Sequence, residues 1–453
     1  MKLWQSEHPV SPGSEKKIEA FTVGRDREFD LQLAASDVLG SLAHAQMLQS
    51  VGLLTADEWV AVQRELRAIF REIEAETFTI EPNVEDVHSQ VELLLTRRLG
   101  EAGKKIHSGR SRNDQVLVDL KLFTRTRLQE VVEAAKRLFD LLIARSEQHK
   151  NDLLPGYTHL QIAMPSSFGL WFGAWAEALV DDTEMLLTAY KLANKNPLGS
   201  GAGYGSSFPL DRSLTTRLLG FDTLHFNVVY AQMSRGKTEL VACTALAQLA
   251  GTLGRLAMDV CLYNSQNFGF LTLPDALTTG SSIMPHKKNP DVAELLRGKC
   301  NRLRALPNEV ALVLTNLPSG YHREMQLLKE VLFPAFDEIM NCLEISHFML
   351  LNSQVTPNLL DDPKYDLLFS VERANELVVQ GIPFREAYKQ VKEEVQNGTF
   401  DAAPFRDHLQ HTHEGSIGNL CNEEISESMN EVLSRFPFGR VREAVNQLSS
   451  DQV

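Results

Sequence analysis

The sequence predicts an all-α protein organised around a bundle of long helices. No run of residues between turn signals alternates strictly enough between apolar and polar positions to form a sheet. By contrast, residues 113–154 contain neither glycine nor proline, and their apolar positions recur with a period close to 3.6. One helix over this segment would be roughly 60 Å long, and helices of that length normally lie in bundles where neighbours cover the apolar stripe.

Helical periodicity also predicts the other elements in order. Two patterns precede residue 108, at 29–51 and 55–73, and the second opens with Thr55 as a predicted N-cap followed by acidic residues. After the longest helix come four more long patterns, at 166–195, 228–267, 291–317 and 324–351. Shorter patterns follow at 365–380 and 383–396.

A chain of 453 residues is too long for one ordinary compact core. We expect an N-terminal helical domain at 1–108, a central long-helix bundle domain at 109–356 and a C-terminal helical domain at 357–453. The apolar surface of five long helices is difficult to bury within one chain. A homo-oligomer whose helices share a bundle is therefore expected, and a monomeric bundle is the alternative.

Composition narrows the class of protein. No uninterrupted apolar run is long enough to cross a bilayer, and the N-terminus becomes polar too early for a secretory signal, so a cytoplasmic location is expected. The net charge of −14 argues against nucleic acid or membrane lipid as partners. The five cysteines are odd in number and form no CxxC pair, which argues against a disulfide framework or a zinc site.

The most informative segment is the loop Gly280–Pro290, GSSIMPHKKNP, hereafter the signature loop. It combines two hydroxyls with Lys287 and Lys288, and Asn289 is the predicted N-cap of a helix. Free N–H groups at a helix start and two ammonium groups favour an anion. In that field the alkoxide of Ser281 or of Ser282 would form at lower cost. The alternative is a serine-rich surface loop with solvated lysines.

Polar clusters flank the longest predicted helix at both ends. Ser111, Arg112 and Asn113 come immediately before it, where their donors suit a carboxylate, although simple capping of the helix is an equal alternative. Thr158 and His159 follow its far end, in a polar break between two helices. An imidazole held there could exchange a proton near neutral pH.

Two further groups stand near other helix starts. Glu294 lies in the first turns after Pro290, where it either responds to the helix dipole or orients a histidine. Tyr321, Gln326 and Lys329 cluster near the start of a later helix, a pattern that is usually a solvated face.

Together these motifs resemble one branch of a known superfamily. The segments HSGRSRNDQ, GYTHLQ, GSSIMPHKKNP, Tyr321…Gln326…Lys329 and GIPFREA are similar to those of the argininosuccinate lyases of the fumarase/aspartase superfamily. The resemblance runs from about residue 29 to about residue 388. It implies three all-α domains and a homotetramer built on a central helical bundle, with active sites that take segments from three subunits.

The resemblance implies an enzyme of arginine biosynthesis, a carbon–nitrogen lyase that cleaves argininosuccinate to arginine and fumarate without metal or organic cofactor. Ser281 matches the family's catalytic base. Lys287 and Asn289 match the residues that bind the carboxylate whose charge grows as the Cβ proton leaves. Loss of this proton creates an enolate-like dianion, which requires fixed cations and N–H donors.

The remaining roles are also implied by the resemblance. Thr158 and His159 match a substrate-contacting pair, and Glu294 matches the partner of that histidine. His159 is then either the general acid for the leaving guanidino nitrogen or a binding residue. The substrate-binding positions are Ser111, Arg112, Asn113 and Arg235, with Tyr321, Gln326 and Lys329 for the amino-acid end of the arginine half.

Three positions depart from the pattern of this branch. His286 replaces a usual glutamine and resembles adenylosuccinate lyases. Asp26 replaces a serine that commonly contacts substrate, and Ser234-Arg235-Gly236 retains only the arginine of an Asp-Arg-Asp motif. Two alternatives therefore stay open. One is another fumarate-releasing lyase, such as adenylosuccinate lyase, and the other is an inactive, crystallin-like structural protein on the same fold.

Overall fold

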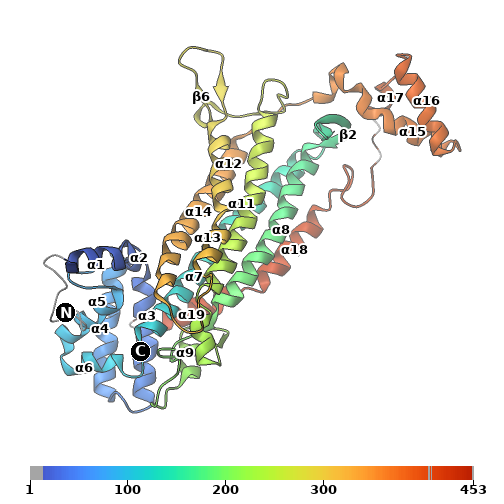
Figure 1. The fold of residues 1–453 in the computed structure, drawn as a ribbon. Coiled ribbons are helices and arrows are strands. Elements are labelled where there is room, and N and C mark those ends of the chain that lie inside the picture. The colour runs from blue at the N-terminus through green and yellow to red at the C-terminus, as the bar shows by residue number, and fades with distance from the viewer. Residues whose placement is uncertain (1–13, 407–408, 410, 451–453) are drawn as a thin grey trace.

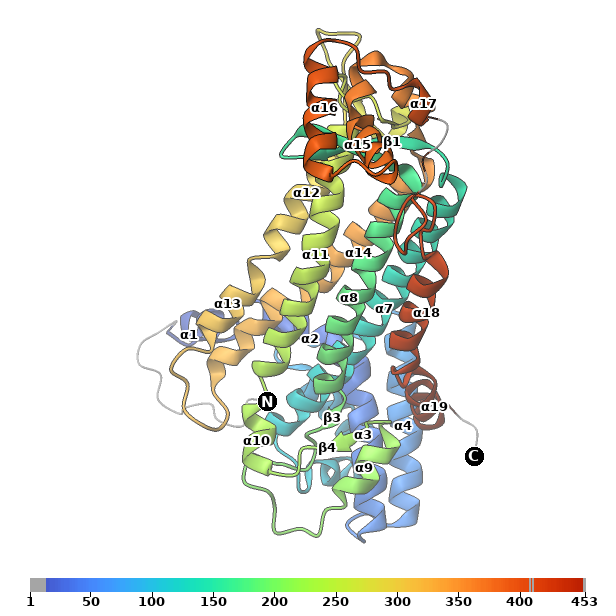
Figure 2. The same ribbon diagram turned by 90° about the vertical axis from the view of Figure 1, so that its right-hand side faces the viewer.

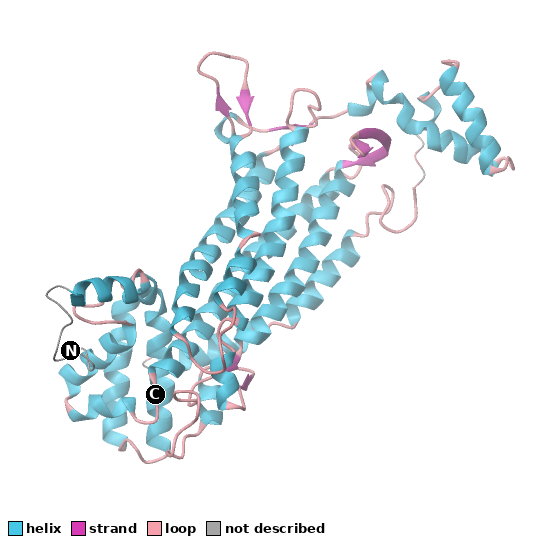
Figure 3. Ribbon diagram, viewed as in Figure 1, coloured by secondary structure: helices cyan, strands magenta, loops and turns pink. Residues whose placement is uncertain are grey.

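The computed structural model describes residues 14–406, 409 and 411–450. Figure 1 shows an elongated bundle of helices with a compact helical group at one end and a smaller one projecting from the other. Helices dominate the described residues, as Figure 3 shows, and the prediction of an all-α fold is confirmed.

The N-terminal group is helical throughout. It consists of α1 (Ser14–Val23), α2 (Asp26–Asp30), η1 (Leu31–Leu33), α3 (Ala34–Ser50), α4 (Ala56–Glu74), α5 (Val87–Leu99), α6 (Glu101–Lys104) and η2 (Lys105–His107). The two predicted helices are present, although the pattern at 29–51 begins with the end of α2 and with η1 before it continues as α3. Thr55 caps α4 in a capping box with Glu58, because each residue's side chain accepts the other's backbone N–H.

The central bundle contains α7 (Arg112–Gln148), α8 (Phe168–Ala193), α11 (Lys237–Tyr263), α12 (Asp291–Leu303), α13 (Leu306–Val313) and α14 (Leu328–Asn352). In Figure 2, α7, α8, α11 and α14 run side by side along most of the bundle, and α7 packs against both α8 and α14. The 37 residues of α7 give a helix roughly 55 Å long. It ends a few residues before the predicted limit because the chain turns into a strand.

Three predicted helices of the bundle are interrupted. The pattern at 228–267 forms α10 (Val228–Met233) and α11, separated at Gly236, whose φ of +81° is a left-handed conformation. The pattern at 291–317 divides into α12 and α13, with Pro307 in the first turn of α13. The pattern at 324–351 begins as η4 (Arg323–Leu327) before α14. Asn289 is the predicted N-cap of α12, and this prediction is wrong because Pro290 occupies that position.

The expectation that no strands would form is wrong at four small ladders. They are β1 (Leu153–Thr158) with β2 (Gln161–Ser167), β3 (Lys195–Asn196) with β4 (Thr223–Leu224), β5 (Leu271–Thr272) with β8 (Gln354–Val355), and β6 (Thr279–Gly280) with β7 (Lys288–Asn289). Only the β1–β2 hairpin is longer than two residues per strand among the described residues. Its register shifts between Pro155 and Tyr157, and this irregularity hides the alternation in the sequence.

The C-terminal part separates into two groups. The first consists of η5 (Leu359–Asp361), η6 (Pro363–Phe369), α15 (Ser370–Val379), α16 (Phe384–Gln396) and α17 (Ala403–Arg406), and it projects from the end of the bundle in Figure 1. The second returns to the bundle: α18 (Asn422–Ser434) packs along α8, and α19 (Phe438–Ser449) packs against α3 and α9 (Arg212–Leu218). The three domain boundaries given above remain predictions.

One continuous hydrophobic core joins the N-terminal group to the bundle. The stretch Val228–Tyr263 is long and apolar enough to cross a membrane by length and composition alone, contrary to the expectation that no apolar run has that length. Half of its most apolar window is buried, and α11 packs between α8, α12 and α14. A buried core helix of a soluble bundle can have the same length and apolar composition as a helix that crosses a membrane.

Candidate active site

A cavity of about 400 Å³ opens beside the N-terminus of α7, hereafter the α7 cavity. Its walls come from α2, α5, the break between α10 and α11, and the segment that leads into α14. Seven residues predicted to bind substrate line it: Ser111, Arg112, Asn113, Arg235, Tyr321, Gln326 and Lys329. The structure therefore brings together motifs that are about 200 residues apart in the chain.

The first turn of α7 supplies one wall of this cavity. Ser111 is the N-cap, and its hydroxyl accepts the backbone N–H of Asn113 at 3.3 Å. Arg112 is not a solvated side chain, because its guanidinium donates to Ser89 Oγ at 2.7 Å and contacts Glu85 and Asp86 at 3.2 Å. The first turn of α7 is therefore both capped by Ser111 and part of the cavity wall.

Asp114, which is not among the predicted site residues, fixes this turn in place. Its carboxylate accepts backbone N–H groups of Ser111 at 2.8 Å, Gly199 at 2.9 Å and Gly201 at 3.0 Å. Burial raises its pKa to about 6 although these bonds favour the charged form. In the sequence, Asp114 stands three residues after the N-cap Ser111, a spacing typical of a capping box, and this spacing could have indicated its role.

Lys329 lines the cavity and is 3% exposed. Its ammonium contacts Asp30 Oδ1 at 2.5 Å and Asp26 Oδ1 at 2.6 Å. Burial alone lowers the pKa of Lys329, but the two carboxylates outweigh it and raise that pKa overall. Asp26 therefore holds a cation of the cavity, and burial raises the pKa of Asp26.

Arg235 and Gln326 connect the cavity walls to one another. Arg235 donates from Nη2 to the Met325 carbonyl at 3.1 Å, and its guanidinium carbon lies 5.3 Å from the ring centroid of Tyr321. Gln326 donates to the carbonyls of Thr22 at 3.1 Å and Val23 at 3.3 Å, at the end of α1. These bonds hold the segment before α14 against α1 and α11.

The signature loop lies at the opposite end of the bundle, as the β6–β7 hairpin at the top of Figure 1. Ser281 Oγ accepts the backbone N–H groups of Ile283 at 3.3 Å and Met284 at 3.1 Å. Lys288 pairs with Asp275, whereas among the described residues no carboxylate lies within ion-pair distance of Lys287. Asn289 ends the hairpin, and Glu294 is exposed on the first turn of α12.

Thr158 and His159 lie at the tip of the β1–β2 hairpin, and both are exposed. His159 and Leu160 have φ values of 55° and 58°, so two non-glycine residues adopt left-handed conformations at this turn. The hairpin follows the C-terminus of α7, whereas the α7 cavity lies at its N-terminus. The two are thus separated by about the 55 Å length of that helix.

The predicted site residues therefore form three groups in one chain: the α7 cavity, the hairpin tip and the signature loop. Each supplies only part of the chemistry that the sequence predicts. Residues 14–304 match the family model described as a lyase. The chain is 58% identical over 447 residues to the argininosuccinate lyase of Bacteroides thetaiotaomicron, and the match covers 99% of both chains.

The chain belongs to the argininosuccinate lyase family. A more distant argininosuccinate lyase, from Stenotrophomonas maltophilia, is 42% identical and covers 85% of this chain and 89% of its own. Among solved structures, EDDS lyase in complex with formate has a TM-score of 0.76 at 20% identity, covering 98% of this chain and 94% of that one. A class II fumarase from Schistosoma mansoni has a TM-score of 0.69 at 17% identity, with 92% and 95% covered. These two share the fold.

Proposed function

We propose that this lyase cleaves argininosuccinate to arginine and fumarate by β-elimination. The observation that carries the proposal is the α7 cavity, which collects the residues expected for the arginine half of the substrate. Its lining contains both acidic and basic side chains, as a zwitterionic amino-acid end requires. Tyr321, Gln326 and Lys329 are assigned to that end.

The proposed reaction begins with removal of a proton from the carbon next to a carboxylate. Ser281 is assigned as the base, because two backbone N–H groups already point at its Oγ and would stabilise an alkoxide there. Lys287 and Asn289 are assigned to the carboxylate that gains charge. The C–N bond then breaks, its electron pair leaves with the guanidino nitrogen, and the former C–H pair forms the double bond of fumarate.

Thr158 and His159 are assigned as a pair of residues that contact the substrate. His159 either protonates the leaving nitrogen or binds the substrate, with Glu294 as its partner. Because the elimination changes no oxidation state, proton transfer and charge stabilisation are sufficient for it, and no metal or organic cofactor is expected. The exposed signature loop could close over the substrate and exclude water from the dianion.

We further propose a homotetramer with shared active sites. Within one chain the α7 cavity and the hairpin tip lie about one α7 length apart, so a single protomer does not assemble the proposed site. Copies packed around a common bundle would bring the three groups together from three chains. The substrate and other copies of the chain are the expected partners, in the cytoplasm, with neither nucleic acid nor membrane involved.

A turnover assay tests the proposed function directly. The protein is incubated with argininosuccinate or with adenylosuccinate, fumarate is followed by absorbance, and arginine is quantified separately. Equal amounts of arginine and fumarate from argininosuccinate alone are expected. Turnover of adenylosuccinate alone would reassign the substrate, and no turnover of either would support a crystallin-like structural role.

A further inference from the structure

Arg235 lines not only the α7 cavity but also a second, much smaller cavity between α7 and the first turn of α11, hereafter the inner cavity. Its volume is about 10 Å³, which is room for one water molecule at most. Its polar lining comes from Lys121 and Thr124 of α7 and from Arg235, Thr238 and Glu239. Because the inner cavity is too small for a substrate, its charged side chains act on one another rather than on a ligand.

Two cations and one carboxylate share the inner cavity. Lys121, Arg235 and Glu239 are 2%, 4% and 3% exposed, respectively. A buried charge is costly unless an opposite charge or hydrogen-bond partners compensate it. Within this lining, Glu239 is the carboxylate available to both cations.

Lys121 has hydrogen-bond partners of its own. Its ammonium donates to the Leu192 carbonyl at 3.1 Å and to Thr238 Oγ1 at 3.0 Å. Burial lowers the pKa of Lys121 to about 8, although the charge of Glu239 acts in the opposite direction. A lysine in this range can release its proton near neutral pH, whereas an arginine keeps its charge. Arg235 is therefore the cation that always requires a compensating carboxylate.

The Arg235 guanidinium is only partly satisfied by hydrogen bonds. Nη2 donates to the Met325 carbonyl at 3.1 Å, whereas Nε and Nη1 are buried without a hydrogen-bond partner among the described residues. The same side chain lines the α7 cavity, where it is one of the residues assigned to substrate binding. Its position in the larger cavity therefore depends on what holds it in the smaller one.

Glu239 also fixes the backbone on both sides of this arginine, together with Thr238. Gly236 has no side chain to cap α11, and Glu239 Oε2 accepts the Gly236 N–H at 2.7 Å. On the other side of Arg235, the Ser234 carbonyl accepts a hydrogen bond from the Thr238 hydroxyl at 3.1 Å. Neither chain neighbour of Arg235 is charged, so Glu239 is its nearest acid along the sequence.

We propose that Glu239 is a positioning residue for the lyase reaction. Its carboxylate holds the Arg235 guanidinium at the wall of the α7 cavity, through the charge that it places in the inner cavity and the bond that it makes to Gly236. The substrate role of Arg235 rests on the proposed function, and the role of Glu239 goes beyond it. The competing explanation is a purely structural Glu239 that only compensates Lys121.

Glu239→Gln separates the charge of this residue from its capping bond. The amide oxygen of glutamine still accepts the Gly236 N–H, whereas the amide NH₂ group replaces a carboxylate oxygen beside the cations. The KM for argininosuccinate is expected to rise by about fivefold or more, with kcat changed by less than about twofold. A structural loss alone would lower Tm and the yield of assembled enzyme and leave KM unchanged. Glu239→Asp, which keeps the carboxylate, should recover most of the loss in KM.

The same substitution leaves the buried Lys121 without an opposite charge, which destabilises the fold. It is therefore repeated in a Lys121→Met background, where that cation is absent. Lys121→Met/Glu239→Gln is expected to have a higher KM than Lys121→Met alone, again by about fivefold or more. Equal KM values in this pair would mean that Glu239 serves only Lys121, and the proposal would be wrong.

A double-mutant cycle with Arg235→Gln identifies the residue through which Glu239 acts. Arg235→Gln is expected to raise KM by itself, and Glu239→Gln is expected to add less than about twofold to that effect. Calorimetry with L-arginine on the assembled enzymes repeats the cycle without turnover. Full and independent effects of the two substitutions would overturn the proposal. Failure of the proposed function would appear elsewhere, as absence of argininosuccinate turnover by the unaltered enzyme.

Discussion

At the scale of single residues, the clearest prediction concerns the effect of replacing Ser281 on turnover. Ser281→Ala removes the proposed base, so turnover of argininosuccinate is expected to fall by about 10²–10⁴-fold. Ser282→Ala is the matched control, with a milder loss. Steady-state kinetics on variants with unchanged assembly and substrate binding checks this, and a loss below about tenfold for Ser281→Ala would assign the base elsewhere.

The two lysines of the signature loop provide a second comparison. Lys288 is already paired with Asp275, whereas Lys287 is assigned to the carboxylate that gains charge. Lys287→Met is therefore expected to lower kcat by about 10²–10³-fold, and Lys288→Met by much less. Equal and mild effects in the same assay would mean that both lysines only attract the substrate from a distance.

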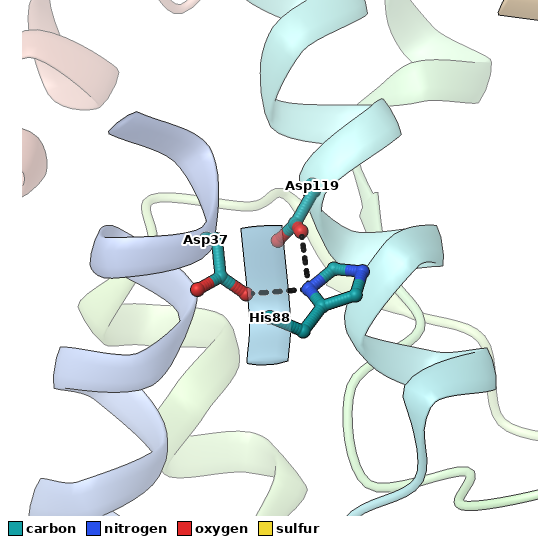
Figure 4. A group of neighbouring side chains, drawn as sticks. All are labelled: Asp37, His88 and Asp119. Atoms are coloured by element: carbon teal, nitrogen blue, oxygen red, sulfur yellow. Dashed lines mark hydrogen bonds and ion pairs between the residues drawn. The ribbon is translucent and has the colours of Figure 1, made fainter. Parts of the chain in front are cut away.

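His88 of α5 is buried, and its Nδ1 lies 2.7 Å from Asp37 Oδ1 and 3.4 Å from Asp119 Oδ2 (Figure 4). This cluster makes folding stability depend on pH. The pKa of His88 is about 10 in the folded protein, above the ordinary 6.5, so protonation of the ring favours the folded state. This contribution is complete below about pH 6.5 and is lost as the pH rises toward 10. Denaturant unfolding of the unaltered protein and of His88→Gln should therefore show a stability difference that shrinks over this range. A constant difference would mean that the ring is neutral.

At the scale of elements, the break between α10 and α11 depends on Gly236. Its φ is +81°, and a Cβ atom there would meet Leu314 Cδ2 at 2.2 Å. Gly52, with φ +79° and no atom within 4 Å of the added Cβ, is a matched control for the backbone conformation alone.

Gly52→Ala is expected to lower the free energy of unfolding by about 1 kcal/mol, because only the left-handed backbone is strained. Gly236→Ala should cost clearly more, since the Leu314 side chain must also move. Urea titration of both variants measures the difference. Equal losses would show that this neighbour adapts without cost.

Helices were predictable from sequence wherever the signal is local. The capping box at Thr55 and the absence of glycine and proline along α7 are properties of neighbouring residues. The β1–β2 hairpin escaped prediction because Pro155 and Gly156 interrupt its alternation, and the α10–α11 break because Gly236 resembles any tolerated helical glycine.

The same distinction applies to the candidate site. Residues in contiguous motifs, such as Ser111 to Asn113, were selected from sequence, and the structure places them in the α7 cavity. Asp37, His88 and Asp119 come from three helices and meet only after folding, so none stands out in its own segment. Asp30 escaped for the same reason, because its partner Lys329 is 299 residues away.

At the scale of the whole molecule, the separation of the three groups makes assembly testable. If different chains supply His159 and Ser281, then His159→Asn and Ser281→Ala proteins should rescue each other. Dissociating, mixing and reassembling them places both lesions in some sites and neither in others. The unmutated sites should regain activity well above that of each parent.

The control for this mixing experiment is each parent taken through the same cycle alone. Hybrid tetramers are confirmed by mass spectrometry of differently tagged chains before activity is measured. Hybrids that form yet remain as inactive as the parents would place both residues of one site in one chain, and the shared-site proposal would be wrong.

The length of α7 also restricts how this gene can change over time. Inserting or deleting one residue within Arg112–Gln148 would shift everything beyond it by about 1.5 Å and rotate it by about 100°. The hairpin that bears His159 would then lie in a different position and orientation, even if every side chain of the site were retained. Substitutions in α7 should accordingly be tolerated far more often than changes of length. Length variation among relatives is expected in the connections, and reading-frame-preserving indels within the helix should abolish growth without arginine.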